Sequence, residues 1–173
     1  MDWWGKLGLG LSAGAAGLGL TQTPLDDAAR LAHLEALSSR YQTWFPTVPE
    51  VTAAQLAQRL DQGEPLVLVD VRTAAERAIS TLPGAIPAEV VARDLDAYRG
   101  QQLVAYCTIG VRSGEWAEEQ RAKGLDVRNL RGSILAWTYL GRDLVDPEGA
   151  PVRRLHVYGA AWDLARTDYA AVW

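Results

Sequence analysis

The chain has 173 residues, a hydrophobic fraction of 49% and a formal net charge of −4. This length suits one domain with terminal extensions, and the hydrophobic fraction is enough for a sizeable core. No long basic run is present, which argues against nucleic acid as the main partner. The single cysteine, Cys107, excludes an intramolecular disulfide framework and a cysteine-rich zinc site.

Residues 1–22 are predicted to form an apolar, glycine-rich arm. Residues 7–20 read LGLGLSAGAAGLGL, a run shorter than the roughly 20 apolar residues that a spanning helix needs. The first six residues carry one cation and one acid, a weak pattern for a secretory signal, and Trp3 and Trp4 suit a membrane interface. We expect a loosely ordered arm, with a peripheral membrane anchor and an uncleaved signal as alternatives. The expected location is the cytoplasm, with membrane association or export as the alternative.

Residues 23–50 are predicted to hold an amphipathic helix followed by a linker. Thr23 is a suitable N-cap, and Pro24 suits the first helical position. Leu31 and Leu34 begin an apolar stripe along the helix. The helix is therefore expected to pack on the domain that follows or on a partner.

Residues 51–141 alternate short apolar runs with capped helices. Short apolar runs bounded by turns are typical of buried parallel strands. The predicted elements, in chain order, are a helix from Thr52 to Gly63, a strand at 65–70, a helix at 73–78, a strand near Ile86, a helix from Pro87 to Tyr98, a strand at 103–106, a helix at 113–123, a strand at 127–130 and a helix at 133–140. This alternation predicts an α/β fold, with an open, mostly parallel sheet and helices on both faces. Residues 142–173 are predicted to form a less regular C-terminal extension, with residues 155–158 as an added strand or an extended lead.

Cys107 lies between the predicted strand at 103–106 and the predicted helix at 113–123. Loop N–H groups and a helix N-terminus then point at one sulfur and stabilise its thiolate, so the pKa of Cys107 is expected to be low. The alternative is a buried structural thiol. Gly110 permits dihedrals that turn N–H groups inward. Arg112 closes the loop, where it either binds an anionic substrate or braces a carboxylate.

Asp70 and Arg72 follow the predicted strand at 65–70. The carboxyl ends of parallel strands meet at one edge of a sheet, so these residues are expected on the same edge as Cys107. We interpret them as supporting residues that form a structural ion pair or loop anchor, with direct catalysis as the alternative. Glu76 lies one helical turn beyond Arg72 and is expected to pair with it.

Other side chains that carry chemistry are interpreted mainly as packing residues. His156 is expected to be a satisfied strand histidine, with acid–base catalysis as the alternative. Trp116, Trp137 and Trp162 are expected to pack in the core or on helices rather than to stack on a substrate.

Four segments of the chain, in order, resemble the rhodanese family of sulfurtransferases. These segments are residues 66–72 with Glu76, residues 82–86, residues 104–113 and residues 129–137. The resemblance covers about one domain. The sequence departs from the family at Ser80 and Thr81, which stand where the family has Gly and His. It also has Thr108 where many members have Arg or Lys, which removes a cation from the loop.

The resemblance implies sulfur transfer through a persulfide on Cys107. The thiolate would take a sulfane sulfur from thiosulfate or a persulfide, and loop N–H groups would cradle the outer sulfur. The implied binding loop consists of Thr108, Ile109, Gly110, Val111, Arg112 and Ser113. Cyanide or a thiol would then remove the sulfur, and a protein thiol is a further candidate acceptor. Because the chain has no second cysteine, the acceptor comes from outside it. No metal ion or other cofactor is expected.

Two other functions stay open at the level of sequence. The arm and the C-terminal extension suit a sulfur-relay or regulatory binding module with little turnover of its own. Related phosphatases and arsenate reductases use a longer loop, Cys-x5-Arg, around a tetrahedral oxyanion. Here only four residues separate Cys107 from Arg112, and the shorter ring favours sulfur over phosphate.

Overall fold

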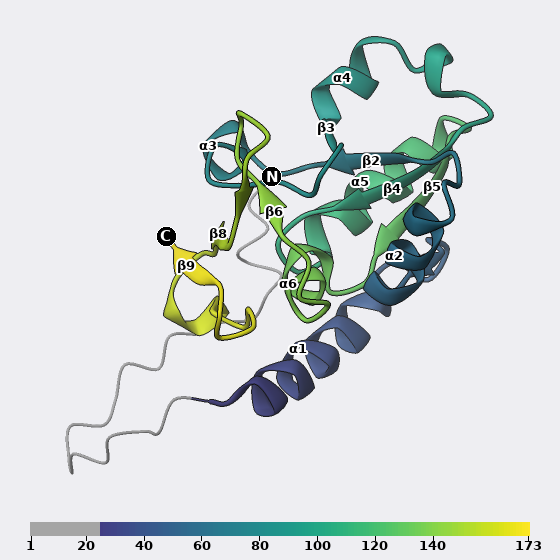
Figure 1. Ribbon diagram of the computed structural model, residues 1–173. Helices are drawn as coiled ribbons and strands as arrows, with labels where there is room; N and C mark the ends of the chain where they lie inside the picture. The colour runs from purple at the N-terminus through teal and green to yellow at the C-terminus, as the bar shows by residue number, and fades with distance from the viewer. Residues whose placement is uncertain (1–24) are drawn as a thin grey trace.

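The computed structural model describes residues 25–173 (Figure 1). Its central sheet has the strand order β1-β5-β4-β2-β3, and every neighbouring pair runs parallel. The strands are β1 Glu50–Val51, β2 Val67–Asp70, β3 Ile86–Pro87, β4 Gln102–Tyr106 and β5 Asp126–Leu130. The predicted α/β fold with a parallel sheet is confirmed.

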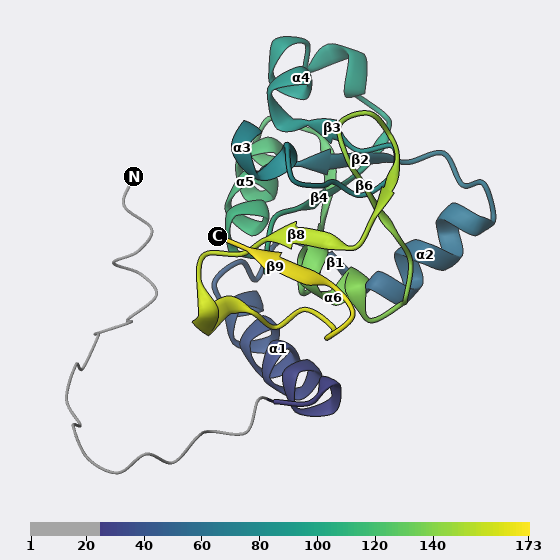
Figure 2. The ribbon, with the colours of Figure 1, turned by 60° about the vertical axis from the view of Figure 1, so that its left-hand side comes forward.

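Helices cover both faces of this sheet (Figures 1 and 2). One face carries α1 Asp27–Gln42, α2 Ala53–Asp61 and α6 Ser133–Thr138, and the other carries α4 Ala88–Arg93 and α5 Val111–Ala122. Side chains alternate along β4, so that Val104 and Tyr106 enter the first core and Leu103 and Ala105 enter the second. Helix α3, Ala74–Arg77, follows the carboxyl end of β2.

The first helix begins later than predicted. Its N-cap is Asp26, whose carboxylate accepts the N–H of Ala29 at 2.8 Å. The expected cap, Thr23, lies outside the described residues together with Pro24. An aspartate caps a helix at least as well as a threonine, which explains the later start. The helix packs on the domain, which was one of the two predicted arrangements. Its residue Leu34 is buried in the core beside α6.

The predicted helix from Pro87 to Tyr98 is divided into two pieces. Helix α4 ends at Arg93, and Asp94 leaves the helical conformation with φ −148° and ψ 80°. A short 3-10 helix, Asp96–Tyr98, follows. The Asp94 carboxylate accepts the N–H of Ala97 at 3.1 Å. This local side-chain bond replaces a backbone bond of a continuous helix, which explains the break.

The C-terminal extension packs against the domain rather than projecting from it. It contains an antiparallel pair, β6 Leu144–Val145 with β7 Pro151–Val152, and a parallel pair, β8 Arg154–His156 with β9 Ala170–Val172. The added strand predicted near residue 155 is present, but it pairs with β9 and not with the central sheet. Leu155 and Val157 are buried in the same core as α6. Extension and domain therefore share one hydrophobic core.

The predicted arm, residues 1–22, lies outside the described residues, so its contact with a membrane stays a prediction. Among residues 25–173, no helix is both long enough and apolar enough to cross a membrane.

Candidate active site

Cys107 lies directly after β4, at the start of a tight loop that leads into α5. The N–H of Gly110 donates to the Cys107 sulfur at 3.1 Å, and the Ser113 hydroxyl lies 3.6 Å from the same sulfur. Gly110 adopts φ +114°, a conformation that side-chain-bearing residues rarely adopt, and it caps α5. The helix begins at Val111, two residues before its predicted start at Ser113, so Arg112 belongs to its first turn. The loop and the helix N-terminus thus converge on one sulfur.

This environment favours the thiolate. Burial by itself raises the pKa of Cys107, because a charged sulfur loses its hydration. The charge of Arg112, the hydrogen bonds from Ser113 and the N–H of Gly110 outweigh burial and lower the pKa below its ordinary value. A lowered thiol pKa beside a cation is typical of a reactive cysteine rather than a structural one.

Two polar residues, Asn129 in β5 and Ser133 at the start of α6, hold the loop in place. The Ser113 hydroxyl donates to Oδ1 of Asn129 at 2.7 Å, and Nδ2 of Asn129 donates to the carbonyl of Gly110 at 3.0 Å. The N–H of Cys107 donates to the Ser133 hydroxyl at 3.0 Å. Buried polar groups that are fully paired make a loop rigid. Asn129 and Ser133 are not among the residues predicted for the site, although both lie in a segment that resembles the rhodanese family.

Glu76 pairs with Arg112 and not with Arg72, which corrects the expectation from helical spacing. Nη1 and Nη2 of Arg112 donate to the two carboxylate oxygens of Glu76 at 2.8 and 2.7 Å. Glu76 also caps α3 by accepting from the backbone N–H and hydroxyl of Thr73. Burial alone raises the pKa of Glu76, but Arg112 and the Thr73 donors lower it to about 2. Arg112 therefore braces a carboxylate, one of its two expected roles.

Asp70 and Arg72 form an ion pair at the end of β2, with nitrogen and oxygen 2.7 Å apart and both side chains at most 1% exposed. Arg72 also donates to the carbonyl of Ser80 at 2.6 Å, and the Tyr106 hydroxyl donates to Asp70 at 2.6 Å. Neither charged residue lines the cavity at Cys107. The geometry matches their interpretation as a structural pair.

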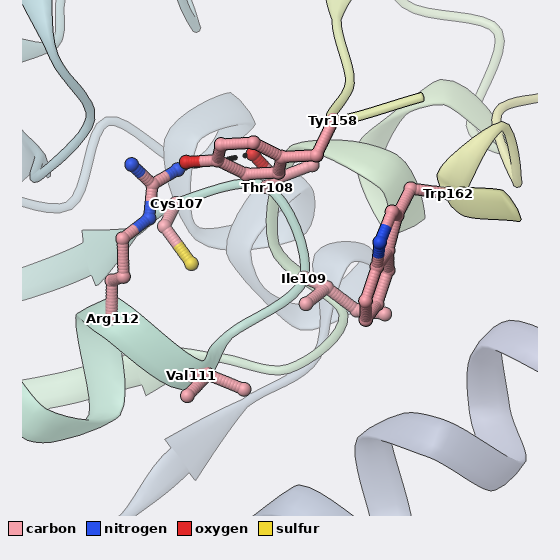
Figure 3. A pocket seen from close by; sticks show the side chains of 7 residues that line it. All are labelled: Cys107, Thr108, Ile109, Val111, Arg112, Tyr158 and Trp162. Atoms are coloured by element: carbon pink, nitrogen blue, oxygen red, sulfur yellow. Dashed lines mark hydrogen bonds between the residues drawn. The ribbon is translucent and has the colours of Figure 1, made fainter. Parts of the chain in front are cut away.

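A small cavity adjoins the sulfur of Cys107, with a volume of about 10 Å³. Its lining residues are Cys107, Thr108, Ile109, Val111, Arg112, Tyr158 and Trp162 (Figure 3). This volume is at the lower limit for one water molecule. Four of the predicted loop residues thus line the cavity with Cys107. The other two, Gly110 and Ser113, do not line it but contact the Cys107 sulfur.

Comparison with known proteins identifies the family. The family model of the rhodanese-like domain matches residues 52–139. The chain belongs to the rhodanese-like domain family. Its relatives include a sulfurtransferase from Allochromatium vinosum, 37% identical over 106 residues that span 59% of this chain and 99% of that protein.

Other relatives show that this rhodanese-like domain occurs in different settings. A tRNA uridine(34) hydroxylase from Xanthomonas euvesicatoria pv. vesicatoria is 36% identical over 104 residues, which span 51% of this chain and 42% of that protein. The crystal structure of thiosulfate sulfurtransferase from Pseudomonas aeruginosa superposes with a TM-score of 0.54 at 21% identity, over 75% of this chain and 25% of that one. At this identity the superposition supports the fold alone.

Two residues at the cavity of this rhodanese-like domain protein lie outside the matched region. Tyr158 follows β8, and Trp162 ends the 3-10 helix Ala160–Trp162. Trp162 packs in the core, as expected, and also lines the cavity, a role that the sequence did not suggest. His156 lies in strand β8, as expected, and does not line the cavity. The expectation that it is satisfied is wrong, because its buried Nδ1 has no hydrogen-bond partner among the described residues and its ring meets the Tyr158 ring edge-on at 5.7 Å. Tyr158 and Trp162 both lie beyond residues 52–139, which the family model matches, so the motifs of the domain did not link them to Cys107.

Proposed function

We propose that this protein is a sulfurtransferase that carries a sulfane sulfur as a persulfide on Cys107. The donor is thiosulfate or a persulfide, and the acceptor is a thiophile such as cyanide or a thiol. One observation carries the proposal. The Cys107 sulfur receives the N–H of Gly110 at 3.1 Å, at the N-terminus of α5, in a loop with only four residues between Cys107 and Arg112.

In the first half-reaction the Cys107 thiolate attacks the outer sulfur of the donor. A new S–S bond forms, and the bond between that sulfur and the rest of the donor breaks, releasing sulfite or a thiol. Loop N–H groups and the dipole of α5 stabilise the negative charge on the transferred sulfur. In the second half-reaction an acceptor nucleophile attacks the same sulfur and regenerates the thiolate.

The acceptor is external to the chain. A thiol within the chain would have to be a second cysteine, and the sequence has only Cys107. We propose a small thiol or a thiol on a partner protein as the acceptor, and the cytoplasm as the location.

Mass spectrometry of the intact protein tests the proposal. After treatment with thiosulfate or glutathione persulfide, Cys107 should gain the mass of one sulfur atom, and cyanide should remove it as thiocyanate. The substitution Cys107→Ser removes the only thiol, so any sulfur that it retains is not on cysteine. Failure of every donor to add sulfur to the wild-type protein would exclude this function. Phosphate release from an aryl phosphate that Cys107→Ser abolishes would indicate phosphatase chemistry instead.

A relay function is the second candidate, and the burial of the thiol favours it. Cys107 is 1% exposed, and Tyr158 and Trp162 line the cavity beside it. A thiol so buried suits transfer to a docked protein that displaces these side chains. A persulfide on Cys107 that is stable to cyanide, but lost to a protein acceptor, would support the relay over free turnover.

A further inference from the structure

The C-terminal extension contributes two aromatic rings to the lining of the cavity at Cys107. Figure 3 shows Tyr158 and Trp162 on the extension, facing the loop that carries Cys107, Ile109 and Val111. Trp162 is 9% exposed and belongs to the core, so its ring is held in place. Together with the loop residues, these side chains line a cavity of about 10 Å³ beside the sulfur.

A space of this size selects for the shape of the donor. It admits about one atom beside the sulfur of Cys107. In thiosulfate the sulfane sulfur is bonded directly to a sulfur that bears three oxygens, so a bulky tetrahedral group follows the reacting atom. In a hydropersulfide the sulfane sulfur is bonded to a divalent sulfur and then to a methylene, so the reacting end is slender. The second shape needs less room beside the two rings than the first.

The charge at the site acts in the same direction. Arg112 is the only cation that lines the cavity among the described residues. Its charge is already paired with both oxygens of Glu76, at 2.7 and 2.8 Å. The Tyr158 ring lies 4.9 Å from the Arg112 guanidinium carbon, and its hydroxyl donates to Glu76 at 3.2 Å. A dianion such as thiosulfate would lose its hydration there without an uncompensated cation to replace it.

We propose that Tyr158 and Trp162 are specificity-determining residues that make this protein select hydropersulfide donors over thiosulfate. The inference rests on the proposed sulfur transfer at Cys107. In the selected reaction the Cys107 thiolate attacks the outer sulfur of R–S–SH, a Cys107–S bond forms, and the S–S bond of the donor breaks. The proton of the donor passes to the departing thiolate, so the products are the Cys107 persulfide anion and R–SH.

The test compares two donors on the full chain. Rates of Cys107 persulfide formation are measured by mass spectrometry with glutathione persulfide and with inorganic thiosulfate. In the wild type the rate constant for the persulfide should exceed that for thiosulfate by about tenfold or more. In Trp162→Ala this ratio should fall by about fivefold or more, through faster loading from thiosulfate. Tyr158→Ala should lower the ratio in the same way.

Trp44→Ala is the matched control, because Trp44 is a partly buried tryptophan that does not line the cavity. It should keep the wild-type ratio. If Trp162→Ala does not fold, Trp162→Leu provides the same comparison. A wild-type protein that loads from thiosulfate as fast as from glutathione persulfide would overturn the inference, and so would an unchanged ratio in both extension variants. In either case sulfur still reaches Cys107, so the proposed function stands. If neither donor adds sulfur, the proposed function itself fails.

Discussion

Arg112 donates from both terminal nitrogens to the two carboxylate oxygens of Glu76, at 2.8 and 2.7 Å. This ion pair joins the first turn of α5, which follows β4, to α3, which follows β2. It holds the Arg112 charge close to Cys107, where that charge lowers the thiol pKa. The rigidity of the loop and the reactivity of the thiol therefore depend on the same contact.

Replacing Arg112 should make Cys107 less acidic. In Arg112→Met the positive charge that counteracts burial is gone, so the pKa of Cys107 should rise. The rate of alkylation by iodoacetamide, measured against pH, should show a midpoint shifted to higher pH. Arg121→Met serves as control, because Arg121 lies at the far end of the same helix and contacts β5. An identical midpoint in wild type and Arg112→Met would contradict this role.

Glu76 should make the protein sensitive to acid. The pKa of Glu76 is lowered in the folded state from 4.5 to about 2. Its charged form thus stabilises the fold above pH 4.5, and this contribution is lost as the pH falls towards 2. The free energy of unfolding, from urea titrations, should drop by up to about 3 kcal/mol across this window. In Glu76→Gln the contribution is absent, so the acid dependence should be smaller. Equal acid dependence of the unfolding free energy in the two proteins would argue against a lowered pKa of Glu76.

Removing the Ser113 hydroxyl should slow persulfide formation. The hydroxyl lies 3.6 Å from the Cys107 sulfur and also donates to Asn129. Ser113→Ala removes the hydroxyl dipole near the sulfur and the contact that holds the loop to Asn129, so it should raise the pKa of Cys107 and slow loading at neutral pH by about three- to tenfold. Ser39→Ala, on the exposed side of α1, should leave the rate unchanged. A loading rate in Ser113→Ala equal to that of the wild type would remove Ser113 from the site.

The pair Asp70–Arg72 should contribute to stability rather than to chemistry. Arg72→Leu leaves the Asp70 carboxylate buried without its cation, which should cost about 3–5 kcal/mol of unfolding free energy. The double variant Asp70→Asn, Arg72→Leu should recover part of this loss, because no unpaired charge remains. Urea unfolding of the three proteins measures both effects. A single variant that keeps wild-type stability would show that the buried pair is not structural.

The substitution Gly114→Ala should destabilise the protein, although alanine normally favours a helix. An added Cβ on Gly114 would clash with the ring of Phe45, in the segment that links α1 to the domain. Overpacking of this kind costs about 1–3 kcal/mol. Thermal unfolding should show a lower midpoint, and Phe45→Leu in the same chain should restore part of it. A higher unfolding midpoint in Gly114→Ala alone would mean that the Phe45 ring shifts to accommodate the methyl group without loss of stability.

The local features of the fold and of the nucleophile were predictable from the sequence. The sequence around Cys107 predicts a strand, a loop and a helix in that order. An apolar run precedes Cys107, a glycine lies in the loop and a helical segment follows, and each of these signals depends only on neighbouring residues. Thr52, the first residue of the predicted helix 52–63, is the N-cap of α2 and forms a capping box with Gln55, another local feature. Asp94 shows the limit of predictions from local patterns. Hydrophobic spacing predicts one continuous helix there, but a hydrogen bond from the N–H of Ala97 to the Asp94 side chain accompanies a break in it.

The partners of the charged residues were decided only by the tertiary structure. In sequence, Arg72 and Glu76 are one helical turn apart, whereas Glu76 and Arg112 are separated by 36 positions. The parallel pairing of β2 with β4 brings the carboxyl ends of both strands together. Arg72 then pairs with Asp70, and Arg112 pairs with Glu76. Such pairing is required because an unpaired buried charge is strongly destabilising. Tyr158 joins Glu76 across 82 positions because the extension shares the core of the domain. The sequence by itself determined the position of the candidate nucleophile, Cys107, and the packing of distant segments decided which side chains surround it.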